Sequence, residues 1–512
     1  MLTDAVNGDP RLSLWLRVRE FAVPPSMVET ATARRSVGDW AGACAAAGVD
    51  VDLDLRSVAR TYGRELLARI RADLRHLAPD LLRWHMPRIA PDGLLRPGLT
   101  LTLARYRTDG RDGPGSVHLV VRTPPAWADA GQRIGLALWD GSRSAPGAPA
   151  PPHPRPRPGR RYRLDLHRHL WDARKSAELR GRCGADRPPG LPPPGPDPWG
   201  TPAAELGCAV ERWADEAAIV LRAEGRSTGT VLVRCGVRRR LLLDLGTGGE
   251  PAADGSRGTD TRPGRGDADA ASLRITAAPG DDGAFTSLPV LPDAATWVLP
   301  DLELIRAGAL DAERLHPLVA SALVPDHAWS GPHEALDRAG RPRLVECRGE
   351  RHRIGLVDGT LTALDHDPAE LRREELLVHL TGAPLPCLRA IDAAHRRPDC
   401  LSGVRERLDH GDIAGALAVV EGLLGPEAVL REGPLRDELE SAARRRIVYG
   451  LYRAGLAEPL PGRVRLDTGR EAVRRDRRGT GRRRSLSLIH ISTPHKRTPT
   501  RYAVFTFKKK KN

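Results

Sequence analysis

Lysine, asparagine and glutamine are almost missing from the first 485 residues, which hold one of each: Lys175, Asn7 and Gln132. Alanine, arginine, glycine, proline, leucine and aspartate dominate instead, as expected for a very GC-rich coding sequence. A phosphate-binding loop needs a lysine after a glycine-rich turn, and no such turn precedes Lys175. The shortage of lysine excludes a P-loop nucleotidase, and a protein-kinase or Schiff-base mechanism would have to use this one residue.

The chain also has no long apolar run, so we expect no membrane-spanning helix and no membrane partner. Residues 1–17 lack the basic start and the following apolar run of a secretory signal peptide. The seven cysteines are widely spaced, and no two of them have the separation of a zinc knuckle or a thioredoxin-like site. These absences predict a cytoplasmic protein without a cofactor, whose thiols are reduced and mostly buried.

The bias in composition breaks in the last 27 residues, which contain five of the six lysines and two of the four phenylalanines. Residues 486–492 resemble the translation of a transposase-type sequencing adapter. Residues 502–505 and the lysine run 508–511 resemble the adapter's far primer site and a homopolymer read-out, with short departures such as Thr493. The resemblance implies that residues 486–512 are not natural protein. The alternative is a genuine basic C-terminal arm.

The net charge of +15 suggests nucleic-acid binding, but this charge is unevenly placed. Residues 486–512 carry +7 and residues 470–484 carry +6, which leaves +2 for residues 1–469. The body of the chain is therefore almost neutral. Composition does not predict a nucleic-acid partner once the tail is removed.

Hydrophobic periodicity predicts an α+β fold that begins with helices and continues into a small antiparallel sheet. Residues 1–95 have helical spacing, with a break near Gly38-Asp39 and a helix over 55–77 that Asp54 would cap. The period then changes to two over 99–106, 116–123 and 133–139. Residues 1–140 are therefore expected to form a helical and then a β-meander region.

The next segments contain predicted linkers. Residues 141–201 are rich in proline, arginine and glycine, with a strand that runs into a helix over 162–179. Residues 202–245 should form a helix to Glu224 and a hairpin near Gly236 that packs with the N-terminal region. Residues 246–283 are almost free of large apolar groups, which predicts disorder.

Residues 284–458 are predicted to form a C-terminal domain with a hairpin and a set of helices. A largely helical stretch covers 302–324, and a hairpin over 343–364 turns at Asp358-Gly359. Further helices are expected over 368–380, 388–395, 404–409, 413–424 and 436–456. Residues 459–485 would then form a basic arm, and residues 486–512 would be disordered.

One histidine-rich segment could hold a metal ion. If this segment is extended, Asp165, His167 and His169 share one face. Carboxylate and imidazole groups are suitable ligands for a divalent metal. The segment could instead begin a helix, which would separate the three side chains, or the histidines could be ordinary polar residues.

Other patterns fail in their context or have a simpler explanation. Residues 225–229 have the letters of a nucleophile elbow, but the predicted order is helix, turn, strand instead of strand, turn, helix. The aspartates of 365–367 and 409–412 precede helices, so we interpret them as caps and not as acid/base partners of the adjacent histidines. The alternating aspartates of 50–54 lack the glycine and glutamate that a calcium loop needs.

No complete catalytic constellation remains, so the leading hypothesis is an accessory, non-enzymatic cytoplasmic protein that acts through protein contacts. The alternative is a metal-dependent or His/Asp-based hydrolase whose residues converge only in the fold. A weak nucleic-acid binder that uses the C-terminal arginine-rich segment is the third hypothesis. A cleft that brings His167 or His169 together with two other ligands would favour the hydrolase.

Overall fold

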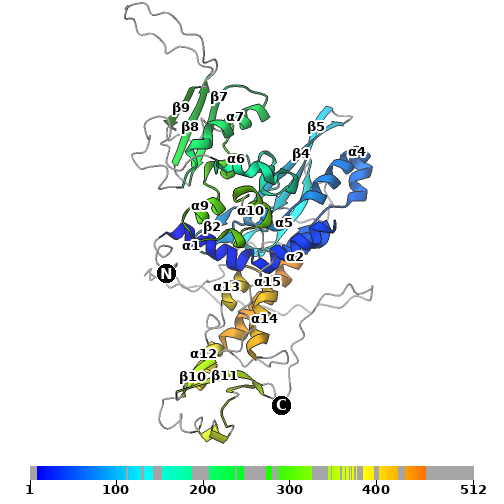
Figure 1. The fold of residues 1–512 in the computed structure, drawn as a ribbon. Coiled ribbons are helices and arrows are strands. Elements are labelled where there is room, and N and C mark those ends of the chain that lie inside the picture. Colours follow the sequence, from blue (N-terminus) through cyan, green and yellow to red (C-terminus); the bar gives the residue numbers. More distant parts are fainter. Residues whose placement is uncertain are drawn as a thin grey trace, which may run out of the picture. The chain divides into compact units, whose positions relative to one another are not determined.

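The computed structural model contains helices and small sheets, which confirms the predicted α+β fold (Figure 1). The structure describes residues 9–110, 113–128, 132–141, 153–186, 207–236, 239–246, 272–278, 285, 287–325, 344–347, 349–357, 360–363, 365–367, 369–370, 372–373, 376, 385–396, 403–424 and 433–456. Within these ranges, no helix combines the length and the apolar character that crossing a lipid bilayer requires.

The main core is built by N-terminal helices and a four-stranded sheet. The strands lie in the order β1-β6-β5-β4, in which β1 is parallel to β6 and the other neighbours are antiparallel. The helices are α1 (Pro10–Arg17), η1 (Val18–Ala22), α2 (Pro25–Ser36), α3 (Trp40–Ala46), α4 (Leu55–His76) and α5 (Pro79–Trp84), and the strands are β1 (Val49–Val51), β4 (Thr100–Gly110), β5 (Gly113–Arg122) and β6 (Ile134–Trp139). The three predicted strands are confirmed. The three-residue β1 was missed because it is too short for a period-two pattern.

Helix α4 shows how the sequence determines this region. Its apolar side chains recur at helical spacing, and Leu66, Ile70 and Leu74 are buried in the main core. The carboxylate of Asp54 accepts a hydrogen bond from the backbone N–H of Arg56 at 2.9 Å and caps the first turn. The predicted cap is confirmed, and the predicted helix is present but interrupted by a kink at Gly63, whose φ of +87° is non-helical.

Residues 153–186 also pack into the main core, including Cys183, which lies in a segment expected to be a linker or surface loop. Leu164, Leu170 and Trp171 are buried there. The predicted strand and helix are replaced by η3 (Leu164–Leu166), η4 (Arg168–Leu170), η5 (Ala173–Glu178) and the short α6 (Leu179–Cys183). The prediction failed because such short 3-10 turns have no hydrophobic period of their own. Other parts of 141–201 lie outside the described residues.

A second sheet, β7-β8-β9, is antiparallel and packs against α7 (Figure 1). The elements are η6 (Val210–Arg212), α7 (Trp213–Ala223), β7 (Gly229–Cys235), β8 (Arg239–Gly246) and β9 (Ser272–Ala277). The hairpin predicted near Gly236 is confirmed, and this glycine has a φ of +83°, which suits a tight turn.

Strand β9 contradicts the predicted disorder of residues 246–283. It bonds to β8 over six residue pairs, from Leu241↔Ala277 to Gly246↔Ser272. An edge strand is held largely by backbone hydrogen bonds to its neighbour. Strand β9 therefore forms with the two apolar side chains Leu273 and Ile275 and without a longer hydrophobic pattern. The flanking residues of 246–283 lie mainly outside the described ranges.

Residues 299–322 belong to the main core as well. Leu304, Leu315 and Val319 are buried in it. The elements here are α8 (Asp293–Thr296), α9 (Pro300–Arg306), η7 (Ala312–Arg314) and α10 (Pro317–Leu323). The predicted grouping of 284–458 as one C-terminal domain therefore does not match the packing. The single helical stretch expected over 302–324 is broken into short helices.

The C-terminal part combines a small antiparallel sheet, β10-β11-β12, with helices. The elements are β10 (Leu344–Cys347), β11 (Glu350–Val357), β12 (Thr360–Ala363), α12 (Pro386–Arg396), α13 (Val404–Asp409), α14 (Ile413–Leu424) and α15 (Pro434–Arg453). Val357 pairs with Thr360, which confirms the predicted hairpin, while the predicted turn residues 358–359 lie outside the described residues. Most of the helix predicted over 368–380, and all of residues 459–512, lie outside the described residues.

Candidate functional site

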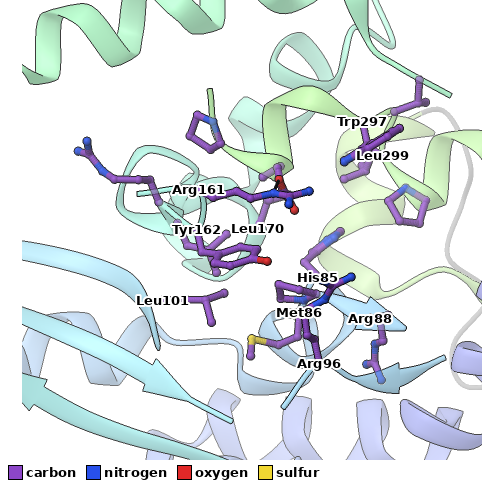
Figure 2. Close-up of a pocket in the computed structure, with 18 of the residues that line it drawn as sticks. His85, Met86, Arg88, Arg96, Leu101, Arg161, Tyr162, Leu170, Trp297 and Leu299 are labelled. Atoms are coloured by element: carbon purple, nitrogen blue, oxygen red, sulfur yellow. Dashed lines mark hydrogen bonds and ion pairs between the residues drawn. The ribbon is translucent and has the colours of Figure 1, made fainter. Parts of the chain in front are cut away.

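A cavity of about 480 Å³ lies beside the main core, where segments distant in sequence meet (Figure 2). Part of its wall comes from α1, from β4 and from residues 85–88 and 96, which lie around the short hairpin of β2 (Arg88–Ile89) and β3 (Leu94–Leu95). Residues 161–164, 170 and 292–300 form the rest. Cavities of this size are typical of small-molecule sites.

Five arginines line this cavity, and three of them are paired with carboxylates. Arg11 pairs with Glu303 at 2.7 Å. Arg161 forms an ion pair with Asp293. Burial acts against the charge of Arg161, but Asp293 outweighs it and raises the pKa of Arg161. Arg163 lies between two carboxylates of neighbouring segments.

Of the other two arginines, Arg88 has no carboxylate contact in the described part of the chain, and Arg96 interacts with Asp293 only electrostatically, without an ion-pair contact. The Arg88 guanidinium donates to the carbonyl oxygens of Arg83 and Gly93 at 2.7 and 3.0 Å. Burial, together with the nearby Arg83 guanidinium, lowers the pKa of Arg88 well below its ordinary value. Arg96 is exposed, and its guanidinium bonds to no described residue. An anionic group in the cavity would stabilise both cations.

The remaining wall is aromatic and aliphatic. Figure 2 shows Tyr162 and Leu101 on one side of the cavity and Trp297 and Leu299 on another. Trp15 of α1 also lines it. Apolar walls with a few convergent charged groups are typical of sites that hold a ligand with an apolar body and a charged end.

His85 is the one histidine among the described lining residues. Its side chain is 4% exposed, and its Nε2 lies 4.0 Å from Asp301 Oδ2. Burial, followed by His316, Arg19 and Arg88, lowers the pKa of His85 to about 3. His85 is therefore neutral near pH 7.

A buried histidine–aspartate pair lies behind this wall. His316 Nε2 and Asp80 Oδ2 are 2.9 Å apart, and both side chains are 1% exposed. Neither residue lines the cavity. The Trp84 indole N–H donates to Asp301 at 2.8 Å in the same region. We interpret these contacts as internal support for the fold, because a buried polar group must be hydrogen-bonded to be tolerated.

The predicted metal ligands lie in short turns and not in an extended segment. Asp165 is bound by Arg163 and Arg105 at 2.9 and 3.2 Å. The rings of His167 and His169 are 5.7 Å apart and edge to face. His167 Nδ1 lies 3.8 Å from a glutamate of α7. We grouped these residues because alternate side chains of an extended strand share one face. The segment is not extended, so this argument does not apply to it. A metal at Asp165, His167 and His169 stays a prediction.

A second cavity of about 910 Å³ is lined by Ser116 and His118. Ser116 Oγ and His118 Nε2 are 3.1 Å apart, which is hydrogen-bonding distance. The other ring nitrogen of His118 is buried without a partner among the described residues. A serine nucleophile needs a base that a third group orients, so this pair is incomplete.

Two interpretations of sequence motifs can be checked against the structure. Two of the four aspartates that we interpreted as caps do act as caps, since Asp412 accepts from the Gly415 N–H at 2.9 Å and Asp367 accepts from the Ala369 N–H at 3.0 Å. Asp365 instead binds Arg353, and Asp409 is the last residue of α13. The nucleophile-elbow letters lie between the end of α7 at Ala223 and the start of β7 at Gly229. That order is helix, turn, strand, as predicted.

The cavity residues could not be predicted from the sequence, because the arginines that line the cavity are spread over some 150 positions of a chain that is rich in arginine. No protein-family model matches the chain, and neither a curated protein nor a solved structure matches it. The function must therefore be argued from the site alone.

Proposed function

We propose that this protein binds a small organic anion with a flat apolar body in the 480 Å³ cavity. The observation that carries the proposal is the pair Arg88 and Arg96, which line the cavity beside its aromatic and aliphatic wall and form no ion-pair contact with a carboxylate among the described residues. The charged end of the ligand would pair with these guanidinium groups. Its apolar body would lie against Tyr162 and Trp297.

The lining residues favour binding over covalent catalysis. The described lining residues include no serine, threonine, cysteine or lysine, which are the usual nucleophiles. His85 lines the cavity, but none of these nucleophiles stands there for it to activate. A His/Asp-based hydrolase would activate water instead, so the accessory hypothesis and the hydrolase hypothesis both stay predictions. The cavity does not test whether the protein acts through protein contacts, so that hypothesis stays a prediction.

Isothermal titration with naphthalene-2-sulfonate tests the proposal, with neutral naphthalene-2-sulfonamide as the control ligand. We expect saturable binding of the sulfonate and at least tenfold weaker binding of the sulfonamide. Arg96→Gln should weaken sulfonate binding roughly tenfold, since a charge-assisted hydrogen bond contributes about 1.5–3 kcal/mol. Arg157→Gln removes the same charge from an exposed arginine outside this cavity and should leave binding unchanged. Equal binding of both ligands would reject the proposal.

A further inference from the structure

Two cysteines and a histidine meet in the C-terminal part. Cys347 ends β10, His366 follows β12, and Cys387 lies in the first turn of α12. One ligand atom from each residue lies within 4.8 Å of the other two. Both cysteines are buried, and the His366 side chain is 5% exposed. Cys347 and His366 come from the two outer strands of the sheet or just beyond them, and Cys387 comes from a helix, so only the fold brings the three residues together.

A second histidine stands beside this group. The rings of His352 and His366 are stacked, with centroids 4.0 Å apart and planes 13° apart. His352 Nδ1 and His366 Nε2 are buried and have no hydrogen-bond partner among the described residues. A buried nitrogen without a partner is costly, and two stacked imidazoles that both lack one point to a missing ligand.

The opposite ring nitrogens face carboxylates. His352 Nε2 lies 3.9 Å from Glu350 Oε2, and His366 Nδ1 lies 3.8 Å from Glu370 Oε2. A metal-bound histidine typically presents its other N–H to a carboxylate, which fixes the ring and makes the coordinating nitrogen more basic. Both histidines have a carboxylate on this side, at distances longer than a hydrogen bond.

Beside the larger cluster that joins Ile354 of β11 to Ile391 of α12, the cluster around the two cysteines is small. Its buried apolar residues are four, and two of them are the cysteines themselves: Cys347, Ala363, Leu385 and Cys387. Small regions that bury little apolar surface are commonly stabilised by a metal ion. A bound ion here would connect the β10-β11-β12 sheet to the N-terminus of α12.

We propose that Cys347, Cys387 and His366 bind a Zn²⁺ ion, with His352 as the fourth ligand. Two thiolates and two imidazoles are a common structural zinc set. Each thiol releases its proton to solvent when the sulfur binds the ion, so the two thiolates cancel the charge of Zn²⁺ and no net charge is buried. Bonds of about 2.0–2.3 Å need ligand atoms about 3.3–3.8 Å apart. Small side-chain rotations supply this for Cys347, Cys387 and His366, whereas His352 lies outside that group and must turn out of its stack with His366.

The chain offers a matched control. Cys208 and Cys235 are also buried, and their sulfur atoms are 4.0 Å apart. No group of metal-ligating atoms that includes this pair is found among the described residues. Two adjacent thiols alone therefore do not define the proposed site, and this second pair should not bind zinc.

The test is metal analysis and cobalt substitution of the full chain, prepared without added chelator. We expect one Zn²⁺ per chain. After replacement by Co²⁺, we expect thiolate-to-cobalt charge-transfer absorption in the near ultraviolet and intense visible bands of a tetrahedral site. Cys387→Ser and His366→Gln should abolish both signals, while Cys235→Ser should keep them. His352→Gln should weaken zinc binding at least tenfold.

Amide hydrogen exchange of the wild-type chain keeps the proposal testable if those variants do not fold. Removal of the metal by a chelator should speed exchange in residues 344–396 and leave β4, β5 and β6 unchanged. The proposal is overturned if the folded wild-type chain holds no stoichiometric metal and its cobalt form lacks the charge-transfer band. It is also overturned if thiol titration shows that Cys347 and Cys387 form a disulfide.

Discussion

Among single residues, Glu303 controls the charge beside the cavity. Burial raises the pKa of Glu303 to about 7, although Arg11 opposes this shift. Above that pH the carboxylate neutralises Arg11, which lines the cavity. Below it, Glu303 is protonated and Arg11 loses its counter-charge. Because a raised carboxyl pKa means proton uptake as the pH falls, anion binding should strengthen from pH 8 to pH 6.

We predict that naphthalene-2-sulfonate binds roughly threefold or more tightly at pH 6 than at pH 8, given one additional uncompensated cation nearby. The sulfonate stays ionised at both values, so the ligand does not contribute to the change. Glu303→Gln should bind equally at both pH values, at the affinity that the wild type has at pH 6. Titration calorimetry of the two proteins checks this. A pH dependence that survives in Glu303→Gln would show that another group is responsible.

The individual site residues could be predicted only where a local pattern marks them. Asp54 and Asp412 were recognised as caps because a cap depends on the next three residues alone. Arg88, Arg96 and Cys387 could not be recognised, because their role depends on residues far away in the chain. An isolated cysteine or arginine in a sequence carries no information about its partners.

At the scale of elements, the caps of α3 and α14 are equivalent. Asp39 accepts from the Gly42 N–H at 2.8 Å, and Asp412 accepts from the Gly415 N–H at 2.9 Å. We predict that Asp39→Ala lowers the free energy of unfolding by about 1 kcal/mol. Asp39→Ser keeps an oxygen acceptor and should lose only a few tenths of that. Urea unfolding followed by circular dichroism measures both, and equal losses in the two variants would contradict the capping role.

Elements with a clear local pattern were predicted, including the six-residue α13, whereas some short strands were missed. The hairpin of β11 and β12 has alternating apolar residues and an Asp358-Gly359 turn, and it was found from these local signals. Strands β1 and β9 were missed. Each is fixed by pairing with a neighbour whose position depends on the whole fold, so tertiary contacts decide their conformation.

At the scale of the whole molecule, the hydrophobic clusters of the described residues all lie between Val18 and Ala442. Compact packing assigns Met1–Pro459 to one unit and Leu460–Asn512 to another. We predict that a chain ending at Pro459 keeps the melting temperature of the full chain to within about 2 °C, because no buried cluster is removed. Thermal unfolding of both chains checks this. A clearly lower melting temperature would mean that residues after 459 stabilise the fold.

The domain limits were the least predictable feature of the sequence. Residues 299–322 follow a long polar stretch, yet Leu304 and Val319 pack into the N-terminal core. Composition marks where a chain has little apolar content, but it does not tell which apolar segments pack together.

A crystal structure of the protein with naphthalene-2-sulfonate tests the central claim most directly. We predict that the naphthalene ring occupies the cavity between Tyr162 and Trp297, with a sulfonate oxygen within about 3.2 Å of the guanidinium of Arg88 or Arg96. A sulfonate bound elsewhere, or a ring in the cavity whose sulfonate points away from both arginines, would contradict the proposed function.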